Sequence, residues 1–242
     1  MFKEYLKAVD QETINFLKHN TVENVNFPFY FNLTEIKSKK NKYAIIKQAI
    51  PKDLANFIYN YFLMKKQVYD TCLKERFISP YEIMLGYYEG ANEQIPNTYS
   101  CYSDIAMETL MLKCQLIMEK TTGLKLQPSY TYARIYKKGD VLKRHKDRFS
   151  CEISTTMNLG GDAWDIYLEP SGKENLKGIK VKLNPGDMLV YRGCELEHWR
   201  NKFKGKECCQ VFLHYNNKKT PGSNLNLFDK RPHLGLPAWF KK

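Results

Sequence analysis

Hydrophobic residues follow a helical spacing in the first half of this chain. They recur every three or four positions in residues 1–20, in a stretch opened by Pro51, and in a stretch for which Ser103 is the expected N-cap. Gly123 has the position of a C-terminal stop for the last of these. The pattern predicts three helices before residue 124, with a strand in the apolar run YAIIKQAI just before Pro51.

After Gly123 the apolar residues alternate with polar ones, which is typical of strands. Turn signals such as KKGD and NPGD separate the runs. Eight runs have this character: SYTYARIY, VLKRH, SCEISTTMNL, WDIYLE, IKVKL, MLVYRG, EHWRNKF and CCQVFLHY. Eight short strands predict a sandwich or barrel, and two facing four-stranded sheets in jelly-roll order would make the second and seventh strands neighbours.

Two segments break both patterns. Residues 67–100 are rich in Tyr and interrupted by Gly and Pro, and a segment of this length suits a lid or binding element. The last residues are basic and broken by Pro and Gly, and we expect them either to pack through Phe228, Trp239 and Phe240 or to be partly mobile. We therefore expect a single domain, 1–242, with helical support and a possible lid in 1–124, a β core in 125–216 and a C-terminal extension in 217–242.

Composition narrows the cellular setting. The 242 residues carry a net charge of +12, with lysines scattered along the chain, and this permits an anionic partner such as nucleic acid without any stacking motif or basic helix to support one. The seven cysteines include no CxxC pair, so neither a disulfide framework nor a structural zinc module is indicated. Without a signal peptide or a bilayer-length apolar run, we expect a cytoplasmic protein with no membrane partner.

Candidate metal ligands come from the second and seventh predicted strands. His145 and Asp147 are one residue apart where the second strand closes, and His198 lies in the seventh. If those strands pair, two imidazoles and one carboxylate converge at one open end of the core. Such a set suits Fe(II), because vacant positions remain for a chelating cosubstrate and dioxygen. One alternative is a zinc site completed by water. The other is that His145 and His198 are unrelated surface or core residues that bind no metal.

These residues resemble a known family, the 2-oxoglutarate- and Fe(II)-dependent dioxygenases, and within it the prolyl 4-hydroxylase-like branch. The resemblance covers about residues 128–216. The family pattern of Tyr-x-x-Gly, His-x-Asp, a Pro-Gly-Asp turn and a distal His falls on Tyr136, Gly139, His145, Asp147, Pro185, Gly186, Asp187 and His198.

The resemblance implies a fold and an activity. The fold would be mainly β with helical additions (α+β), namely an eight-stranded double-stranded β-helix flanked by N-terminal helices. The activity would be hydroxylation of a C–H bond, most simply on a prolyl or other peptide or protein substrate. Fe(II) would be the bound cofactor, 2-oxoglutarate and O₂ would be consumed, and succinate and CO₂ would be the coproducts. A non-catalytic β-barrel module for an anionic partner and a cupin-like metalloenzyme without cosubstrate are the alternatives.

The family's basic anchor for the cosubstrate is where this chain departs from the pattern. The last strand usually opens with a Lys or Arg, but this chain has Glu207 and Cys208 there. Lys206 is the nearest basic residue, and alternation places Gln210 on its face. Other residues expected around the cosubstrate are Arg200 and Tyr136, and residues expected to orient ligands or contact substrate are Arg148, Arg192 and Trp164.

Overall fold

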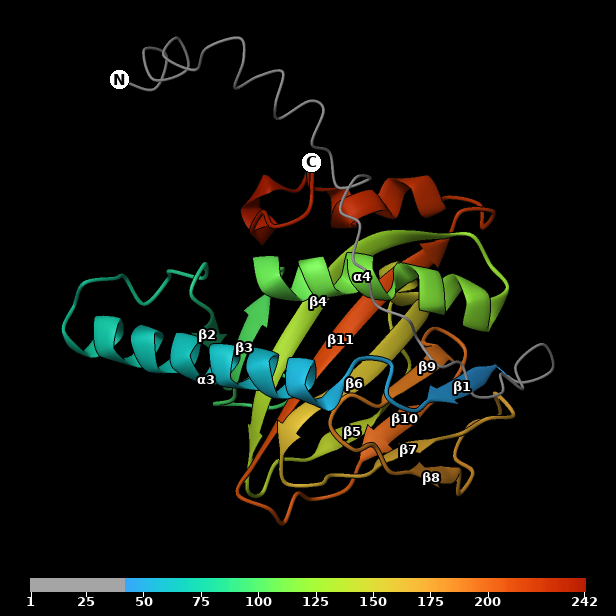
Figure 1. The fold of residues 1–242 in the computed structure, drawn as a ribbon, viewed down its shortest axis with the longest axis horizontal. Coiled ribbons are helices and arrows are strands. Elements are labelled where there is room, and N and C mark those ends of the chain that lie inside the picture. The colour runs from blue at the N-terminus through green and yellow to red at the C-terminus, as the bar shows by residue number, and fades with distance from the viewer. Residues whose placement is uncertain (1–41) are drawn as a thin grey trace, which may run out of the picture. The chain divides into compact units, whose positions relative to one another are not determined.

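The computed structural model describes residues 42–242, so the helix expected in residues 1–20 lies outside the described residues. The chain forms two antiparallel sheets and two long helices (Figure 1). In order, the strands are β1 (Tyr43–Ile46), β2 (Tyr87–Tyr88), β3 (Tyr99–Tyr102), β4 (Leu126–Lys137), β5 (Leu142–His145), β6 (Ile153–Gly161), β7 (Ile166–Leu168), β8 (Ile179–Val181), β9 (Met188–Arg192), β10 (His198–Arg200) and β11 (Glu207–Asn217). The helices are α3 (Lys52–Lys74), α4 (Ile105–Thr122) and the short 3-10 segments η2 (Phe149–Cys151), η3 (Ser223–Lys230) and η4 (Ala238–Phe240).

All eight strands predicted after Gly123 are present as β4 to β11: β4, β6, β9 and β11 lie in the larger sheet, and β5, β7, β8 and β10 lie in the smaller one, as in a jelly roll. The smaller sheet has the order β5-β10-β7-β8. The larger sheet has the order β1-β9-β6-β11-β4-β3-β2 and so contains seven strands rather than the expected four. The extra strands come from the N-terminal half: β1 pairs with β9, and β3 pairs with β4. They satisfy edge hydrogen bonds that would otherwise face solvent.

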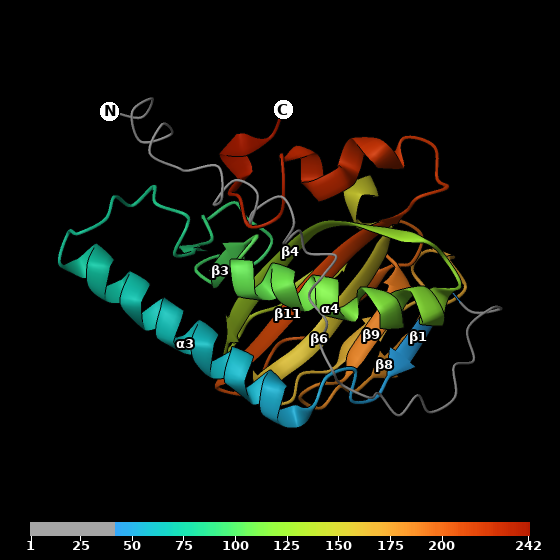
Figure 2. The ribbon, with the colours of Figure 1, turned by 45° about the horizontal axis from the view of Figure 1, so that its top comes forward.

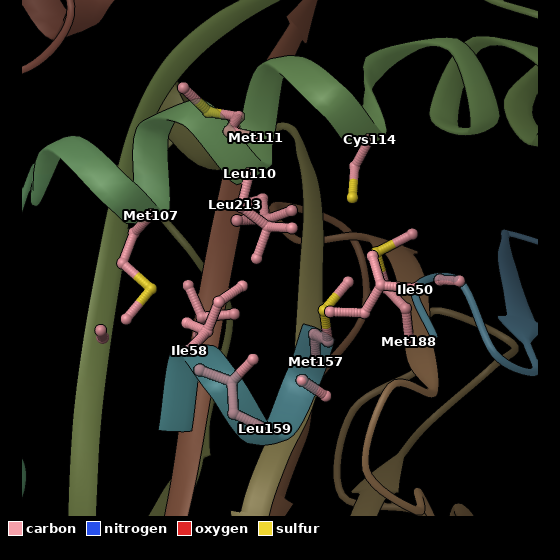
Figure 3. Close-up of a cluster of buried hydrophobic side chains, with 14 of the residues drawn as sticks. Ile50, Ile58, Met107, Leu110, Met111, Cys114, Met157, Leu159, Met188 and Leu213 are labelled. Carbon is pink, nitrogen blue, oxygen red and sulfur yellow. The ribbon is translucent and has the colours of Figure 1, made fainter. Parts of the chain in front are cut away.

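The main hydrophobic core lies between the large sheet and the two long helices (Figures 1 and 2). Met107 and Met111 of α4 and Ile58 of α3 meet Met157 of β6 and Leu213 of β11 (Figure 3). The helical spacing of apolar residues in these segments therefore reflects packing on the sheet. This arrangement leaves the opposite face of the sheet, toward the smaller sheet, for the interior of the β-helix.

Helix boundaries correct the prediction in two places. Asp104, not Ser103, is the N-cap of α4, and its carboxylate accepts the Met107 amide at 3.1 Å, while Ser103 lies in a left-handed turn with φ of 55°. Gly123 ends α4 in a left-handed conformation, as predicted. The segment 67–100 is less irregular than expected, since α3 continues to Lys74. The helix extends this far because its apolar spacing continues to the buried Tyr69.

The Pro-Gly-Asp turn ties the N-terminal half to the β core. The Asp187 carboxylate accepts the Lys47 ammonium at 2.8 Å and the Gln48 amide at 3.0 Å. Gly186 has a φ of 88°, and a Cβ there would lie 2.4 Å from the carbonyl oxygen of Ile50. The role of this turn is therefore structural: it holds the connection between β1 and α3 against the start of β9.

The C-terminal extension packs mainly through polar groups, and of the three aromatic residues expected to pack only Phe228 is half-buried. Trp239 and Phe240 are 57% and 45% exposed. The buried Arg231 guanidinium instead pairs with Glu108 of α4 at 2.8 Å. The Asp229 carboxylate accepts a hydrogen bond from the Tyr102 hydroxyl at 2.6 Å. Ion pairs and hydrogen bonds therefore hold the extension without a large apolar face. Among residues 42–242, no helix has the length and apolar character needed to cross a bilayer.

Candidate metal centre and its cavity

Antiparallel pairing of β5 with β10 brings the predicted ligands together. His145 lies directly opposite His198 in the register, which confirms that the second and seventh core strands are neighbours. Asp147 follows β5, and its amide donates to the Gly193 carbonyl at 2.9 Å, which turns the chain so that the carboxylate points back to the histidines. The ligand atoms of the three side chains lie within 4.8 Å of one another.

The imidazoles are oriented by the main chain. Asp147 Oδ1 is 3.7 Å from Nε2 of His145 and 3.5 Å from Nε2 of His198. The other ring nitrogen of each histidine, Nδ1, faces a carbonyl oxygen: Lys143 at 2.7 Å and Leu196 at 3.1 Å. A hydrogen on Nδ1 satisfies these carbonyls and leaves both Nε2 lone pairs directed at the same point as Oδ1, which is how histidine ligands are usually held.

Charge at the site favours metal binding. Burial lowers the pKa of His145, and the neighbouring His198 lowers it further, so His145 is neutral at pH 7. Burial alone would raise the pKa of Asp147, but electrostatic attraction to His198 and the hydrogen bond from Ser154, with a contribution from His214, hold it well below its usual range. A neutral imidazole beside a carboxylate is the protonation state that a divalent cation requires.

The three ligands line a cavity of about 430 Å³. Its wall comes from the inner faces of both sheets and from the segment after β2. The lining residues are Tyr87, Glu89, Glu93, Gln94, Tyr130, Tyr132, Arg134, Tyr136, Leu142, His145, Lys146, Asp147, Arg148, Cys151, Ile166, Tyr191, His198, Phe212 and His214. A space of this size suits a small cosubstrate together with part of a substrate.

Part of the Tyr-rich segment forms one wall of this cavity. Glu89 is buried and pairs with Arg134 of β4 at 2.9 Å, and the Tyr132 hydroxyl donates to the same carboxylate oxygen. The amide of Glu89 donates to the Thr98 carbonyl and its carbonyl accepts the Asn97 amide, both at 3.0 Å. The segment is therefore attached to the barrel by a buried ion pair. Its position in the wall agrees with the predicted binding element, but sequence spacing gave no sign of Glu89 or Arg134.

A second polar group is deeply buried around Arg200, which is not among the residues that line the cavity. Arg200 of β10 is only 1% exposed. Its guanidinium donates to the Trp164 carbonyl, to the Thr156 hydroxyl at 3.2 Å and to the Gln210 amide oxygen at 3.3 Å, none of which carries a charge. Its Nε has no hydrogen-bond partner, and the same is true of the buried Tyr136 hydroxyl.

Arg200 and Tyr136 share one neighbourhood. The Trp164 ring lies 4.8 Å from the Tyr136 ring and 5.1 Å from the Arg200 guanidinium carbon. Burial raises the pKa of Tyr136 while the charges of Arg134 and Arg200 oppose that rise. Burial also lowers the pKa of Arg200, as expected for a cation without a carboxylate beside it.

The remaining predicted residues lie in different places. Lys206 is exposed, precedes β11 and does not line the cavity, because the turn that its amide makes with Asp162 at 2.6 Å lies outside the barrel. Arg192 pairs with Glu195 at 3.0 Å, also away from the cavity. Trp164 is buried behind Tyr136 instead of lining the space. Arg148 does line it and pairs with Asp229 of the C-terminal extension at 3.1 Å.

Comparison with known proteins identifies the architecture. No family model matches the sequence, and no curated protein matches it. Among solved structures, EctD from S. alaskensis matches with a TM-score of 0.53 and 14% identity, covering 88% of this chain and 86% of that one. SnoK from nogalamycin biosynthesis, a non-heme alpha-ketoglutarate-dependent carbocyclase, matches with a TM-score of 0.54 and 12% identity over 76% and 84% of the two chains.

A prolyl-4-hydroxylase from Pseudomonas putida also matches, with a TM-score of 0.48 and 16% identity over 74% of this chain and 94% of that one. The chain therefore has the double-stranded β-helix fold that 2-oxoglutarate- and Fe(II)-dependent oxygenases adopt.

Proposed function

We propose that this protein is an Fe(II)- and 2-oxoglutarate-dependent oxygenase that hydroxylates a C–H bond. The observation that carries the proposal is the convergence of His145, Asp147 and His198 on one point in a cavity that opens to solvent. Two imidazoles and one carboxylate on one side of a metal leave the other positions open, as this chemistry needs. Within residues 42–242, no other group of His, Cys, Asp or Glu side chains is placed to hold a metal.

The surroundings of the ligands favour iron with a cosubstrate over a hydrolytic zinc site or a cupin-like metalloenzyme. A zinc site with three protein ligands needs only a water in the fourth position. It gives no role to a buried cation such as Arg200, whose Nε has no partner. A dianionic cosubstrate supplies that partner, because one carboxylate can chelate the metal while the other reaches the guanidinium.

Arg200 and Tyr136 are the groups we assign to the far carboxylate of 2-oxoglutarate. Both are buried and both have a donor atom without a partner, and an unsatisfied buried donor costs about 1–3 kcal/mol. A carboxylate between them would satisfy both donors at once. Gln210 and Thr156 complete the group, since each already contacts the Arg200 guanidinium. Lys206 is exposed in the turn before β11, so it lacks the burial that distinguishes Arg200.

Iron with 2-oxoglutarate and dioxygen supplies the oxidising power, and succinate and CO₂ are the coproducts. The protein's own residues bind, orient and exclude water. The Lys143 and Leu196 carbonyls fix the imidazoles of His145 and His198. Buried apolar side chains from both sheets, including Ile166, border the cavity and limit the entry of solvent to the reacting centre.

For the substrate we propose a prolyl or other peptidyl C–H bond, on the strength of the motif resemblance. Tyr87 and Phe212 contribute apolar surface to the cavity, which suits an aliphatic side chain. Arg148 lies beside Asp147 at the same cavity, and its guanidinium is 4.8 Å from the Tyr130 ring and 3.1 Å from Asp229. We assign Arg148 to a substrate contact that the C-terminal extension orients.

A cytoplasmic location fits the cysteines, because all seven are unpaired in the described chain and a reducing compartment keeps thiols free. Nucleic acid remains an unsupported partner, and we propose none.

The test is turnover of 2-oxoglutarate by purified protein with Fe(II) and O₂. We expect slow succinate formation without substrate, and acceleration by a prolyl peptide that gains one oxygen atom by mass spectrometry. His198→Ala should abolish both signals. The paired variants Arg200→Met and Lys206→Met separate the anchor from a surface lysine, since only the first should raise the 2-oxoglutarate requirement. Absence of succinate together with absence of 2-oxoglutarate binding would refute the oxygenase and leave the non-catalytic barrel.

A further inference from the structure

The two carboxylate oxygens of Asp147 have different surroundings. Oδ1 is the atom nearest the histidines, at 3.7 Å from His145 Nε2 and 3.5 Å from His198 Nε2. Oδ2 accepts a hydrogen bond from the Ser154 hydroxyl at 2.9 Å. One oxygen is therefore directed at the metal position, and the other is engaged by the protein.

Ser154 itself is fully buried on β6, and its hydroxyl has one hydrogen and three neighbours that could accept it. These neighbours are Asp147 Oδ2 at 2.9 Å, the Cys151 carbonyl at 2.9 Å and His214 Nδ1 at 3.0 Å. The ionised carboxylate is the strongest acceptor, so the hydrogen belongs to Oδ2. His214 Nδ1 must then donate to the Ser154 oxygen, because two lone pairs facing each other would repel.

His214 is built into this position. It lies on β11 opposite Ser154 in the β6–β11 register, and the centroid of its ring lies 4.6 Å from that of Tyr130, with the two rings tilted by 35°. Burial lowers the pKa of His214 to about 4, so the ring is neutral at pH 7 and only one nitrogen carries a hydrogen. The direction of both hydrogen bonds is then fixed: His214 Nδ1–H donates to the Ser154 oxygen, and the Ser154 hydroxyl donates to Asp147 Oδ2.

Gly193 leaves the space that the hydrogen bond between Ser154 and Asp147 needs. A Cβ at residue 193 would lie 2.4 Å from Asp147 Oδ2 and 2.7 Å from the Ser154 hydroxyl oxygen. Any side chain there would push the carboxylate and the hydroxyl apart. The glycine after β9 is therefore part of the same arrangement.

We propose that His214 and Ser154 are positioning residues that hold Asp147 by Oδ2, so that only Oδ1 binds the metal. The inference rests on the proposed metal site. Its consequence is specific: a carboxylate bound through both oxygens would fill one more position on the metal. Binding through Oδ1 alone keeps three positions open, which are the two for the 2-oxo acid and one for dioxygen.

The first test removes the Ser154 hydroxyl and measures Co(II) affinity of the metal-free protein by calorimetry. Ser154→Ala should weaken Co(II) binding by about 10- to 100-fold, as loss of a group that orients a ligand usually does. Ser129→Ala is the matched control, because Ser129 is also fully buried but its hydroxyl has no partner. Wild-type protein that does not bind Co(II) would overturn the metal site itself. Wild-type binding with equal affinity in Ser154→Ala would overturn only the positioning role.

The second test concerns the ring of His214, which leaves Ser154 in place. His214→Asn keeps a donor near the Nδ1 position and should retain most of the affinity. His214→Phe keeps a ring against Tyr130 but should lose as much affinity as Ser154→Ala. In the Zn(II)-loaded protein, ¹⁵N NMR should report hydrogen on Nδ1 of His214. Hydrogen on Nε2, or unchanged affinity in His214→Phe, would overturn the role of His214.

Discussion

Two polar groups inside the β core differ in how their atoms are satisfied: the metal end, which lines the cavity, and the Arg200 end, of which only Tyr136 lines it. At the metal end, the atoms that do not face the metal have protein partners: Nδ1 of His145 and His198 face carbonyls, and Oδ2 of Asp147 accepts a hydroxyl. At the Arg200 end, the guanidinium Nε and the Tyr136 hydroxyl have none. The metal end is thus oriented by the protein alone, whereas the Arg200 end has two buried donors that a bound anion would satisfy.

The largest effect expected from this comparison is at the metal end. His198→Ala removes a ligand on the strand that carries the site, so we expect loss of Fe(II) binding and of 2-oxoglutarate turnover by more than the roughly 100-fold that changes behind the ligands cause. Calorimetry with Mn(II) and a succinate assay measure both. Retained turnover in this variant would show that the three side chains do not share one cation.

At the other end, Arg200→Met should separate function from stability. Loss of a charged hydrogen bond worth about 1.5–3 kcal/mol should raise the Michaelis constant for 2-oxoglutarate by about 10- to 150-fold. The same change replaces a buried cation that has no anionic partner by an apolar side chain, so we expect a higher melting temperature in the absence of cosubstrate. Lys206→Met is the control for both measurements. A lower melting temperature with an unchanged Michaelis constant would remove Arg200 from the cosubstrate site.

The buried ring of His214 should make the metal end sensitive to acid. Its pKa is about 4 in the folded protein and 6.5 as the ordinary value. Between these values the unfolded chain binds the proton and the folded chain does not, so stability falls as the pH drops from 6.5 toward 4, by on the order of 3 kcal/mol. Urea unfolding of the metal-free protein at several pH values should show a shallower decline in His214→Phe. Parallel curves for the two proteins would contradict this account.

The smallest expected effect is a partial rescue that moves the anchor to the last strand. Cys208 is fully buried and accepts a hydrogen bond from Gln210 at 3.2 Å, so it faces the same group as Arg200. Adding Cys208→Lys to Arg200→Met should lower the Michaelis constant for 2-oxoglutarate about tenfold relative to Arg200→Met alone. The recovery is partial because an ammonium cannot bind a carboxylate with the two-pronged geometry of a guanidinium. A double variant no better than Arg200→Met, yet folded by circular dichroism, would place the cosubstrate carboxylate elsewhere.

The metal end could be predicted from sequence because it depends on local spacing and on one strand pairing. His145 and Asp147 are two positions apart, and the jelly-roll order alone brings His198 beside them. The core strands were predictable for the same reason, since alternation and turn residues are local. The helix cap was missed by one residue because Ser103 and Asp104 are both good caps and only the backbone conformation distinguishes them.

The other end could not be predicted with the same certainty because its chemistry is distributed over separate strands. Arg200 on β10 and Gln210 on β11 meet Tyr136 of β4 only through the curvature of the barrel. Lys206 is nearer than Arg200 to the expected position along the sequence, but it precedes β11 and faces solvent. Glu89 and Arg134 were missed likewise, since their ion pair joins segments 45 residues apart.

The most direct test is an anaerobic titration of the Fe(II)-loaded protein with 2-oxoglutarate, followed by visible absorption. A chelate between the 2-oxo acid and the iron gives a charge-transfer band, which should appear in the wild type and require more 2-oxoglutarate in Arg200→Met. It should not appear in His198→Ala. A wild-type protein that binds Fe(II) and shows no band at saturating 2-oxoglutarate would contradict the central claim that the metal end and the Arg200 end hold one cosubstrate.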